Sequence, residues 1–350
     1  MKATLYFLAS VVCLVLAAGV RGYSSPAEDV KIDPAMLRLF QPLPVVSESQ
    51  KNPITEEKVA LGRMLYFENR LSKNHDVSCN SCHPLDRYGV DGKPVSTGHK
   101  GQKGSRNSPT VYNAAEHLAQ FWDGRAPDVE EQAKGPVMNP VEMAMPSAAN
   151  AVAVLKSIPA YVEGFQRAFP GEKDPVTFDN MALAVGAFER RLLTPGRWDD
   201  FLKGDNTALT NEEKAGFLKF VGVGCARCHT GALLGGRLYQ KLGAVEPWTD
   251  TSDLGRYQLT KRDNDKIVFK VPSLRNIGET GPYFHNGLVP SLDQAVGLMG
   301  KHQLGKRLAS ADIQSIVVWL NALKGRLPAD YIREPARPKS TANTPPPDPS

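Results

Sequence analysis

Two segments of the sequence combine a pair of cysteines with an adjoining histidine. They are Cys79-Asn80-Ser81-Cys82-His83 and Cys225-Ala226-Arg227-Cys228-His229. In a C-x-x-C-H motif the two cysteines can form thioethers with the vinyl groups of a haem, and the histidine can bind the iron. Two disulfides or a zinc site are the alternatives, but haem attachment uses all of these cysteines and both histidines. The motifs therefore predict two covalently bound haem c groups, with His83 and His229 as proximal iron ligands.

Each haem iron can also take a second axial ligand, and the sequence offers one candidate for each haem. His99 lies in a glycine-flanked loop, residues 96–101, and follows His83 by 16 residues. Met299 follows His229 by 70 residues, in the order of proximal histidine and distal methionine that small c-type cytochromes use. A spare histidine is more often a surface or packing residue, and Met299 also fits a helix core. The residues alone leave both ligand assignments open.

The two motifs follow similar segments, which predicts a duplicated cytochrome domain. Thr55 and Thr210 each precede acidic and then apolar residues, and Thr210 forms a capping-box pattern with Glu213. Further helices are predicted over residues 179–193 and 310–323, because apolar residues recur there at helical spacing. Apolar faces of this kind are most simply interpreted as core.

Strand signals are sparse, with only a weak alternation at residues 266–271. The stretches between the expected helices are long and rich in Gly, Pro and Asn. Long loops are uncommon in compact domains unless they line a site, and enclosing a haem is such a reason. The sequence therefore predicts a mainly α fold: two cytochrome c-like haem domains with long loops and little β structure.

The first residues are typical of a secretory signal peptide, with a charged start, an apolar run of about 14 residues and small residues up to position 22. A membrane anchor is the alternative, but such an anchor needs roughly 20 apolar residues. We predict a cleaved signal peptide (1–22), so that no membrane span remains. An N-terminal haem domain (23–193), a C-terminal haem domain (194–330) and a Pro-rich tail (331–350) follow, the tail being disordered or draped over the surface.

Composition excludes several classes of protein. Hydrophobic residues make up 41% and charged residues 23% of the 350 residues, which is typical of a globular chain rather than a fibrous or disordered one. The formal net charge is +5 and becomes about +3 when Lys2 and Arg21 leave with the signal peptide. This charge is far below the clustering that makes nucleic acid an expected partner.

Beyond the haem motifs, several segments resemble the bacterial di-haem cytochrome c peroxidases, and the resemblance covers nearly the whole mature chain. The segments are residues 106–110 (RNSPT), 120–126 (QFWDGRA), 131–136 (EQAKGP), 139–143 (NPVEM), 271–277 (VPSLRNI) and 282–285 (PYFH). The resemblance implies that His99 is the displaceable sixth ligand of a low-potential N-terminal haem. It implies that Met299 is the sixth ligand of a high-potential C-terminal haem.

The same resemblance implies roles for residues near the haems. Glu142 matches the distal acid–base residue, and a carboxylate in a haem pocket can shuttle the proton that peroxide cleavage requires. Trp122 matches a tryptophan between the haems that assists electron transfer. A calcium site is implied for three further residues, and oxygen ligands suit this hard cation. These residues are Asn107, Thr280 and Pro282.

The resemblance further implies a periplasmic enzyme that reduces hydrogen peroxide to water. Electrons from a small donor, such as a monohaem cytochrome c or a blue copper protein, enter at the C-terminal His/Met haem. Peroxide is cleaved at the N-terminal haem after His99 leaves, and a homodimer is possible. One alternative is a di-haem electron-transfer cytochrome without substrate chemistry. Another is a related di-haem oxidase that acts on a protein partner, in which a tyrosine replaces the axial methionine; Met299 argues against it.

Overall fold

Polar N-caps begin the helices that precede the two haem motifs. The computed structural model describes residues 29–350, so the predicted signal peptide at 1–22 lies outside the described residues. The Thr55 hydroxyl accepts a hydrogen bond from the backbone N–H of Lys58 at the start of α2. At the start of α9, Thr210 and Glu213 form the predicted capping box. Local sequence therefore specifies where both helices start.

The chain is mainly helical, as predicted. The α-helices are α1 (Pro34–Leu37), α2 (Glu56–Tyr66), α3 (Cys79–Cys82), α4 (Val129–Met138), α5 (Ala148–Lys156), α6 (Pro159–Ala168), α7 (Phe178–Glu189), α8 (Arg197–Leu202), α9 (Asn211–Val223), α10 (Tyr257–Thr260), α11 (Leu292–Leu304) and α12 (Ser310–Ala322). Short 3-10 turns are η1 (Asn69–Leu71), η2 (Leu85–Arg87), η3 (His99–Gly101), η4 (Ala114–Glu116), η5 (Cys225–Arg227), η6 (Asp263–Asp265) and η7 (Ile277–Glu279). The strands β1 (Tyr239–Lys241) and β2 (Val268–Lys270) pair antiparallel, with Gln240 opposite Phe269. The prediction of a mainly α fold with little β structure is confirmed.

The helices gather into two units that use the same close helix pair. In the first unit Gly62 of α2 lies against α7, where an added Cβ would come within 1.8 Å of the carbonyl oxygen of Ala184. In the second unit Gly216 of α9 lies against α12, where an added Cβ would come within 2.1 Å of the carbonyl oxygen of Ser315. In both units the helix before the haem motif therefore approaches a later helix at backbone distance.

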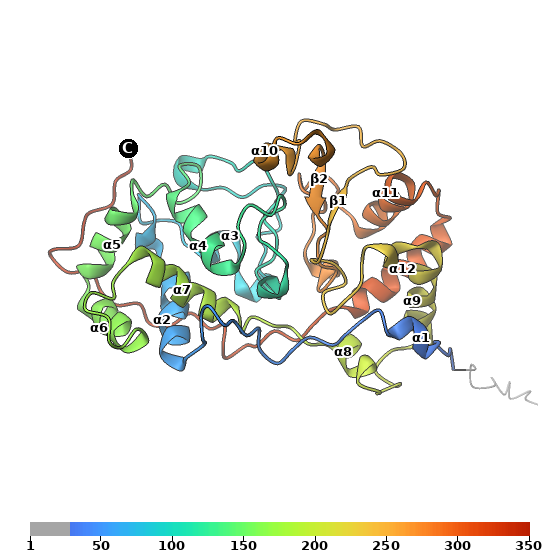
Figure 1. Cartoon of the computed structure of the whole chain (residues 1–350), viewed down its shortest axis with the longest axis horizontal. Coiled ribbons are helices and arrows are strands. Elements are labelled where there is room, and N and C mark those ends of the chain that lie inside the picture. Colours follow the sequence, from blue (N-terminus) through green and yellow to red (C-terminus); the bar gives the residue numbers. More distant parts are fainter. Residues whose placement is uncertain (1–28) are drawn as a thin grey trace, which may run out of the picture.

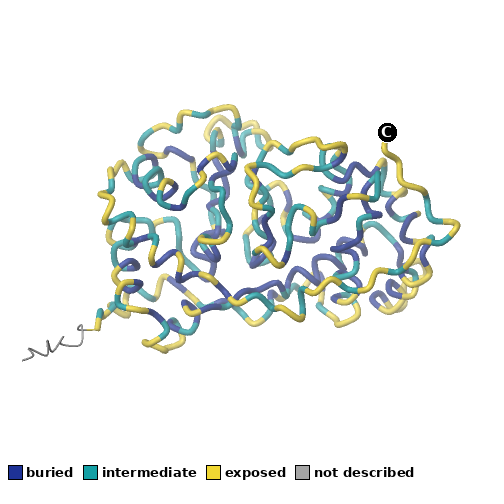
Figure 2. Tube along the Cα trace, turned by 180° about the vertical axis from the view of Figure 1, so that it is seen from behind, coloured by how far each residue is buried: buried dark blue, intermediate teal, exposed yellow. Residues whose placement is uncertain are grey.

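Each unit has its own apolar core. One core packs side chains from α2, α4, α5, α6 and α7, and the other packs side chains from α8, α9, α11 and α12 around Trp198 and Trp319. Figure 1 shows the first unit, with α2 to α7, beside the second, with α9, α11, α12 and the two strands. Figure 2 shows buried residues along the helices of both units and exposed residues along the outer loops.

The segment before α2 crosses from one unit to the other (Figure 1). The ring of Phe40 packs edge-on against Trp198 with centroids 5.7 Å apart, inside the core of the second unit. The backbone N–H of Leu43 donates to the Asp199 carboxylate at 2.7 Å. A few residues later, the N–H of Ser47 donates to a backbone carbonyl of the first unit. Residues 29–43 thus pack with the second unit although they precede the first.

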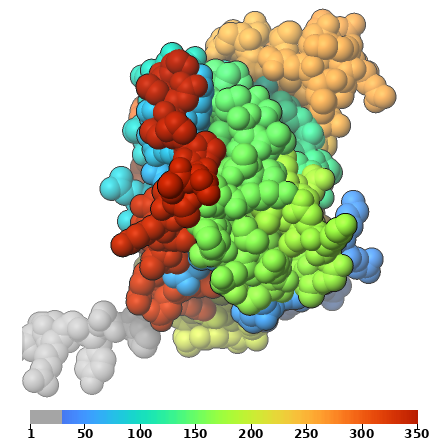
Figure 3. Space-filling view, turned by 90° about the vertical axis from the view of Figure 1, so that its left-hand side faces the viewer, coloured from blue at the N-terminus to red at the C-terminus, as the bar shows by residue number. Residues whose placement is uncertain are grey.

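Residues 331–350 return in the opposite direction and lie along the first unit. Figure 3 shows this segment in red beside the green surface of the first unit. Arg70 donates to the carbonyl oxygen of Pro338 at 2.8 Å, and Thr341 donates to that of Ser157 at 2.9 Å. Within residues 29–350, no helix is long and apolar enough to cross a membrane.

Candidate haem sites

The first motif forms a single helical turn with its histidine at the end. In α3 the backbone N–H of His83 donates to the carbonyl oxygen of Cys79 at 2.9 Å. The imidazole Nδ1 of His83 lies 3.2 Å from the carbonyl oxygen of Gly89. A carbonyl oxygen can only accept, so Nδ1 carries the proton and Nε2 keeps a free lone pair. This is the tautomer and orientation that an iron ligand needs.

The second motif repeats this arrangement. The backbone N–H of His229 donates to the carbonyl oxygen of Cys225 at 3.2 Å. Its imidazole Nδ1 lies 2.9 Å from the carbonyl oxygen of Leu234, so Nε2 is again free. Burial lowers the pKa of both His83 and His229, which favours the neutral imidazole that binds metals.

The cysteines of both motifs fit covalent haem attachment. In the described part of the chain, none of the four cysteines is in a disulfide. Burial raises the pKa of Cys79 and of Cys225 to about 12, which keeps these thiols uncharged. The motif cysteines and histidines therefore fit two haem c groups, as the sequence predicts.

A cavity of about 600 Å³ lies beside the first motif and extends to the face between the units. This volume is within the range of cofactor pockets. Side chains from both units line it, among them Cys79, Cys82, His83, His117, Trp122, Glu142 and Lys270. No residue of the second motif lines this cavity, which therefore belongs to the haem site of the first motif.

Glu142 brings a carboxyl group to this cavity. Its Oε1 accepts a hydrogen bond from the Asn139 amide at 2.8 Å, which orients the side chain. Burial raises the pKa of Glu142, and the charge of Arg125 and the Asn139 hydrogen bond oppose that rise. A half-buried carboxyl with a raised pKa holds a proton at a higher pH than an exposed carboxyl does, so it can act as an acid as well as a base.

His99 lies outside the cavity, although the loop that carries it lines the edge. Ser96 and Gly98 are lining residues, whereas the His99 side chain is not. The imidazole is buried, and its Nε2 lies 3.3 Å from the carbonyl oxygen of Ser350 in the C-terminal segment. The backbone N–H of His99 donates to the carbonyl oxygen of Glu142 at 2.8 Å. The structure therefore places the His99 imidazole beside Ser350 and not among the residues that line the cavity.

Trp122 contacts both the cavity and an apolar cluster of the second unit. Its indole N–H donates to the carbonyl oxygen of Asn107 at 2.9 Å. It lines the cavity, and it packs on a buried cluster around Phe269 and Phe284 against which Met299 also packs. Trp122 thus lies between the first haem site and the surroundings of the predicted axial methionine.

Asn107, one of the three predicted calcium ligands, lies at the contact between the two units. The Asn107 amide nitrogen donates to the carbonyl oxygens of Lys93 and Pro94 at 2.9 and 3.3 Å, which leaves its oxygen free to accept. The backbone N–H of Asn107 donates to the carbonyl oxygen of His285, a few residues after Thr280 and Pro282. An amide oxygen in this position fits a hard cation.

Two groups of contacts at the site were not predicted from the sequence. Arg106 of the first unit forms ion pairs with Asp123 at 2.7 Å and with Asp253 of the second unit at 2.6 Å. Lys270 and His117 meet inside the cavity, 2.5 Å apart. The only signal for either pair is that Arg106 and the segment after Lys270 belong to the segments that carry the family resemblance.

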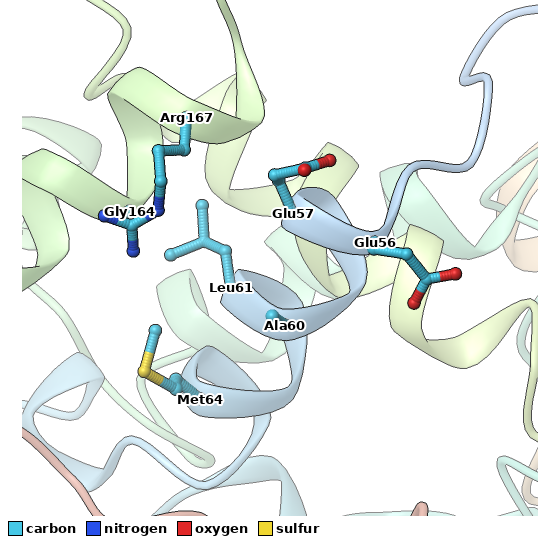
Figure 4. Close-up of a pocket in the computed structure, with 7 residues that line it drawn as sticks. All are labelled: Glu56, Glu57, Ala60, Leu61, Met64, Gly164 and Arg167. Carbon is cyan, nitrogen blue, oxygen red and sulfur yellow. The ribbon is translucent and has the colours of Figure 1, made fainter.

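A second pocket, of about 300 Å³, lies between α2 and α6 in the first unit (Figure 4). Leu61 and Met64 project from α2 toward Gly164, while Glu56 points away. It contains neither a haem-motif residue nor a histidine or cysteine, so it is separate from both haem motifs.

Comparison with known proteins agrees with this arrangement. The family model "Di-haem cytochrome c peroxidase" matches residues 56–207. A cytochrome c551 peroxidase of Pseudomonas aeruginosa is 47% identical over 317 residues, which are 88% of this chain and 90% of that protein. The chain belongs to the di-haem cytochrome c peroxidase family. It is therefore a di-haem oxidoreductase of the peroxidase class.

A second relative and a solved structure are similar to this chain over most of its length. A cytochrome c551 peroxidase of Nitrosomonas europaea is 44% identical over 87% of this chain and 89% of its own. Among solved structures, a MauG-like protein associated with microbial copper homeostasis superposes with a TM-score of 0.74 at 26% identity. That match covers 84% of this chain and 97% of the solved chain. The di-haem peroxidase fold therefore extends over both units.

Proposed function

We propose that this chain reduces hydrogen peroxide to two waters, consuming two protons and two electrons from a small donor such as a monohaem cytochrome c or a blue copper protein. The observation that carries the proposal is the cavity in which the first C-x-x-C-H motif meets the carboxyl of Glu142. When bound, the two haem c groups supply the one-electron redox chemistry and the site of O–O cleavage.

The two haem sites have different roles, electron entry at the C-terminal haem and peroxide cleavage at the N-terminal haem. His229 and Met299 would bind the C-terminal haem iron, and a haem with two protein ligands would supply electron entry rather than peroxide binding. His83 would bind the N-terminal haem iron, with His99 as a displaceable second ligand. The loop that carries His99 supports this role, because Ser96 and Gly98 line the cavity while the His99 side chain contacts Ser350. Trp122 assists electron transfer between the haems, and its position at the first cavity and on the apolar cluster that Met299 also contacts supports this role.

Glu142 moves the proton that peroxide cleavage needs. As a carboxylate it can accept a proton from one oxygen of peroxide, and as an acid it can return that proton to the other oxygen, which leaves as water. The amide of Asn139 keeps the carboxyl in place during both steps. Because burial raises the pKa of Glu142, turnover falls on the acid side at a higher pH than an exposed carboxyl would dictate.

The proposal also includes a calcium site, two haem domains and a periplasmic location. Asn107, Thr280 and Pro282 bind calcium where the units meet, and the free amide oxygen of Asn107 supports this assignment. The domains are 23–193 and 194–330. The protein acts in the periplasm after loss of its signal peptide.

The substitution Glu142→Gln tests the proposal. The glutamine keeps the size of the side chain but cannot take up a proton, so we expect peroxide turnover to fall by about 10²- to 10⁴-fold. The measurement is stopped-flow spectroscopy of calcium-loaded holoprotein whose high-potential haem has been reduced with ascorbate. Glu57→Gln is the control, since Glu57 is exposed and lies at the other pocket.

Three results decide the matter. Fast reoxidation by peroxide in the unmodified protein and in Glu57→Gln, with loss in Glu142→Gln, supports the peroxidase and the role of Glu142. Full turnover in Glu142→Gln overturns the role of Glu142. No reaction of the unmodified protein with peroxide, whether part-reduced or oxidised, identifies an electron-transfer cytochrome instead.

A further inference from the structure

A buried pair of basic side chains lines the cavity of the first haem site. Lys270 belongs to β2, on the side of the second unit that faces the first (Figure 1). It is only 6% exposed, and its ammonium nitrogen lies 2.5 Å from Nδ1 of His117. Both residues line the cavity of the first motif. The second unit thus contributes a cationic side chain to the cofactor site of the first.

This ammonium has no carboxylate partner among residues 29–350. The carboxylate whose charge acts on Lys270 is that of Asp123. This carboxylate is already paired with Arg106 at 2.7 Å and with Arg125 at 3.1 Å. Arg237 is the other charged group that acts on the pair, and its positive charge gives no compensation. An unpaired buried charge is costly, and burial accordingly lowers the pKa of Lys270 to about 7.

The other cationic side chains of the cavity are paired or exposed. Arg106 binds two carboxylates, Asp123 and Asp253. Arg125 pairs with Asp123 and is 43% exposed. Lys103 is exposed at the edge of the cavity. Of the cations that line this cavity, Lys270 is therefore the buried one whose charge is left for a ligand.

The pair presents hydrogen-bond donors to that ligand. A lysine ammonium has three N–H donors and no acceptor, and Nδ1 of His117 accepts one of them. Burial and the neighbouring cation lower the pKa of His117, so its imidazole is neutral and carries its proton on Nε2. The other N–H groups of the Lys270 ammonium and the Nε2–H of His117 can therefore donate to an anion. The anionic groups of a haem are its propionate carboxylates. The vinyl and propionate edges of a haem lie on opposite sides of the macrocycle.

We propose that Lys270 and His117 bind a propionate carboxylate of the haem attached at Cys79 and Cys82. This inference rests on the haem attachment in the proposed function and adds the residues that hold the opposite edge of the cofactor. The carboxylate compensates the buried ammonium, and the ammonium neutralises the carboxylate next to the haem. Because the backbone N–H of Lys270 donates to the carbonyl oxygen of Trp122 at 2.7 Å, the same strand fixes Trp122 beside this edge.

The substitution Lys270→Met tests the site through the cofactor rather than through turnover. It keeps the length of the side chain and removes its charge. A propionate without its cation stabilises the oxidised haem, so we expect the reduction potential of the N-terminal haem to fall at neutral pH. That propionate also takes up a proton on reduction, so the potential becomes more steeply dependent on pH. Spectroelectrochemical titration of the holoprotein across neutral pH measures both effects.

Two further variants and a second measurement complete the test. Lys270→Arg keeps the charge and should keep the potential close to that of the unmodified protein. Lys103→Met removes an exposed lysine of the same cavity and should leave the potential unchanged. Resonance Raman spectra should show a shifted propionate bending mode in Lys270→Met only. If Lys270→Met does not accumulate as folded holoprotein, Lys270→Gln removes the charge while still donating to His117.

The outcomes separate this proposal from the peroxidase assignment. If the uncharged variants at position 270 match Lys103→Met in potential, pH dependence and propionate mode, the propionate site is overturned while peroxide turnover of the same samples still supports the peroxidase. If the potential and the propionate mode shift but the unmodified protein does not consume peroxide, the propionate site is supported and the peroxidase assignment is overturned.

Discussion

At the scale of single residues, a buried ion pair joins two helices of the first unit. The guanidinium of Arg190, at the end of α7, donates to both carboxylate oxygens of Glu130 in α4, at 2.7 and 2.9 Å. Both side chains are 8% exposed, and the amide of Asn52 donates a third hydrogen bond to the same carboxylate. The pair therefore satisfies the buried charge of Glu130, whose pKa is lowered by these hydrogen bonds against the effect of burial.

We expect Arg190→Met to destabilise the protein by about 3–5 kcal/mol, because it leaves the Glu130 carboxylate buried without its partner. The neighbouring residue offers a matched control. Arg191 pairs with Glu56 at the surface, where both groups are more exposed, so Arg191→Met should cost about 0–1 kcal/mol. Denaturant unfolding of the holoproteins measures the free energies. Equal losses in the two variants would contradict the distinction between the buried and the exposed pair.

At the scale of elements, the close pair of α9 and α12 depends on one glycine. Gly216 lies where a side chain would meet the backbone of α12, with Ser315 and Trp319 as the nearest neighbours. Gly222 lies in the same helix with nothing within 4 Å of an added Cβ. Both glycines are helical, but only Gly216 lies where a side chain has no room.

We expect Gly216→Ala to lower the free energy of unfolding by about 1–3 kcal/mol, because the methyl group forces the helices apart. Gly222→Ala should leave stability unchanged or raise it by up to about 1 kcal/mol, because alanine is the better helix former. Thermal unfolding followed by circular dichroism compares them. Equal stability of Gly216→Ala and Gly222→Ala would contradict the close approach of α9 and α12 at Gly216.

At the scale of the whole molecule, the ends of the described chain cross between the units. Residues 29–43 complete the core of the second unit, and residues 331–350 lie along the first (Figures 1 and 3). The ion pair between Arg106 and Asp253 adds a polar contact between the units. The two units are thus joined by these terminal segments as well as by direct contacts between them.

We expect Phe40→Ala to destabilise the second unit by about 3–5 kcal/mol, because it removes an aromatic ring from a packed core. Hydrogen exchange read by mass spectrometry should show faster exchange in α8, α9 and α12. Leu39→Ala is the control, since Leu39 is 48% exposed and should have little effect. Faster exchange confined to the first unit would contradict the packing of Phe40 in the core of the second unit.

The sequence by itself determined what depends on neighbours in the chain. The spacing of each C-x-x-C-H motif, the capping box at Thr210 and the apolar faces of α7 and α12 are local, because a helical turn and a haem attachment each involve only a few successive residues. Tertiary structure alone decided that Lys270 meets His117 and that His99 lies beside Ser350 instead of in the cavity. These contacts join residues more than a hundred positions apart, and the packing of whole units, which no local pattern encodes, brings them together.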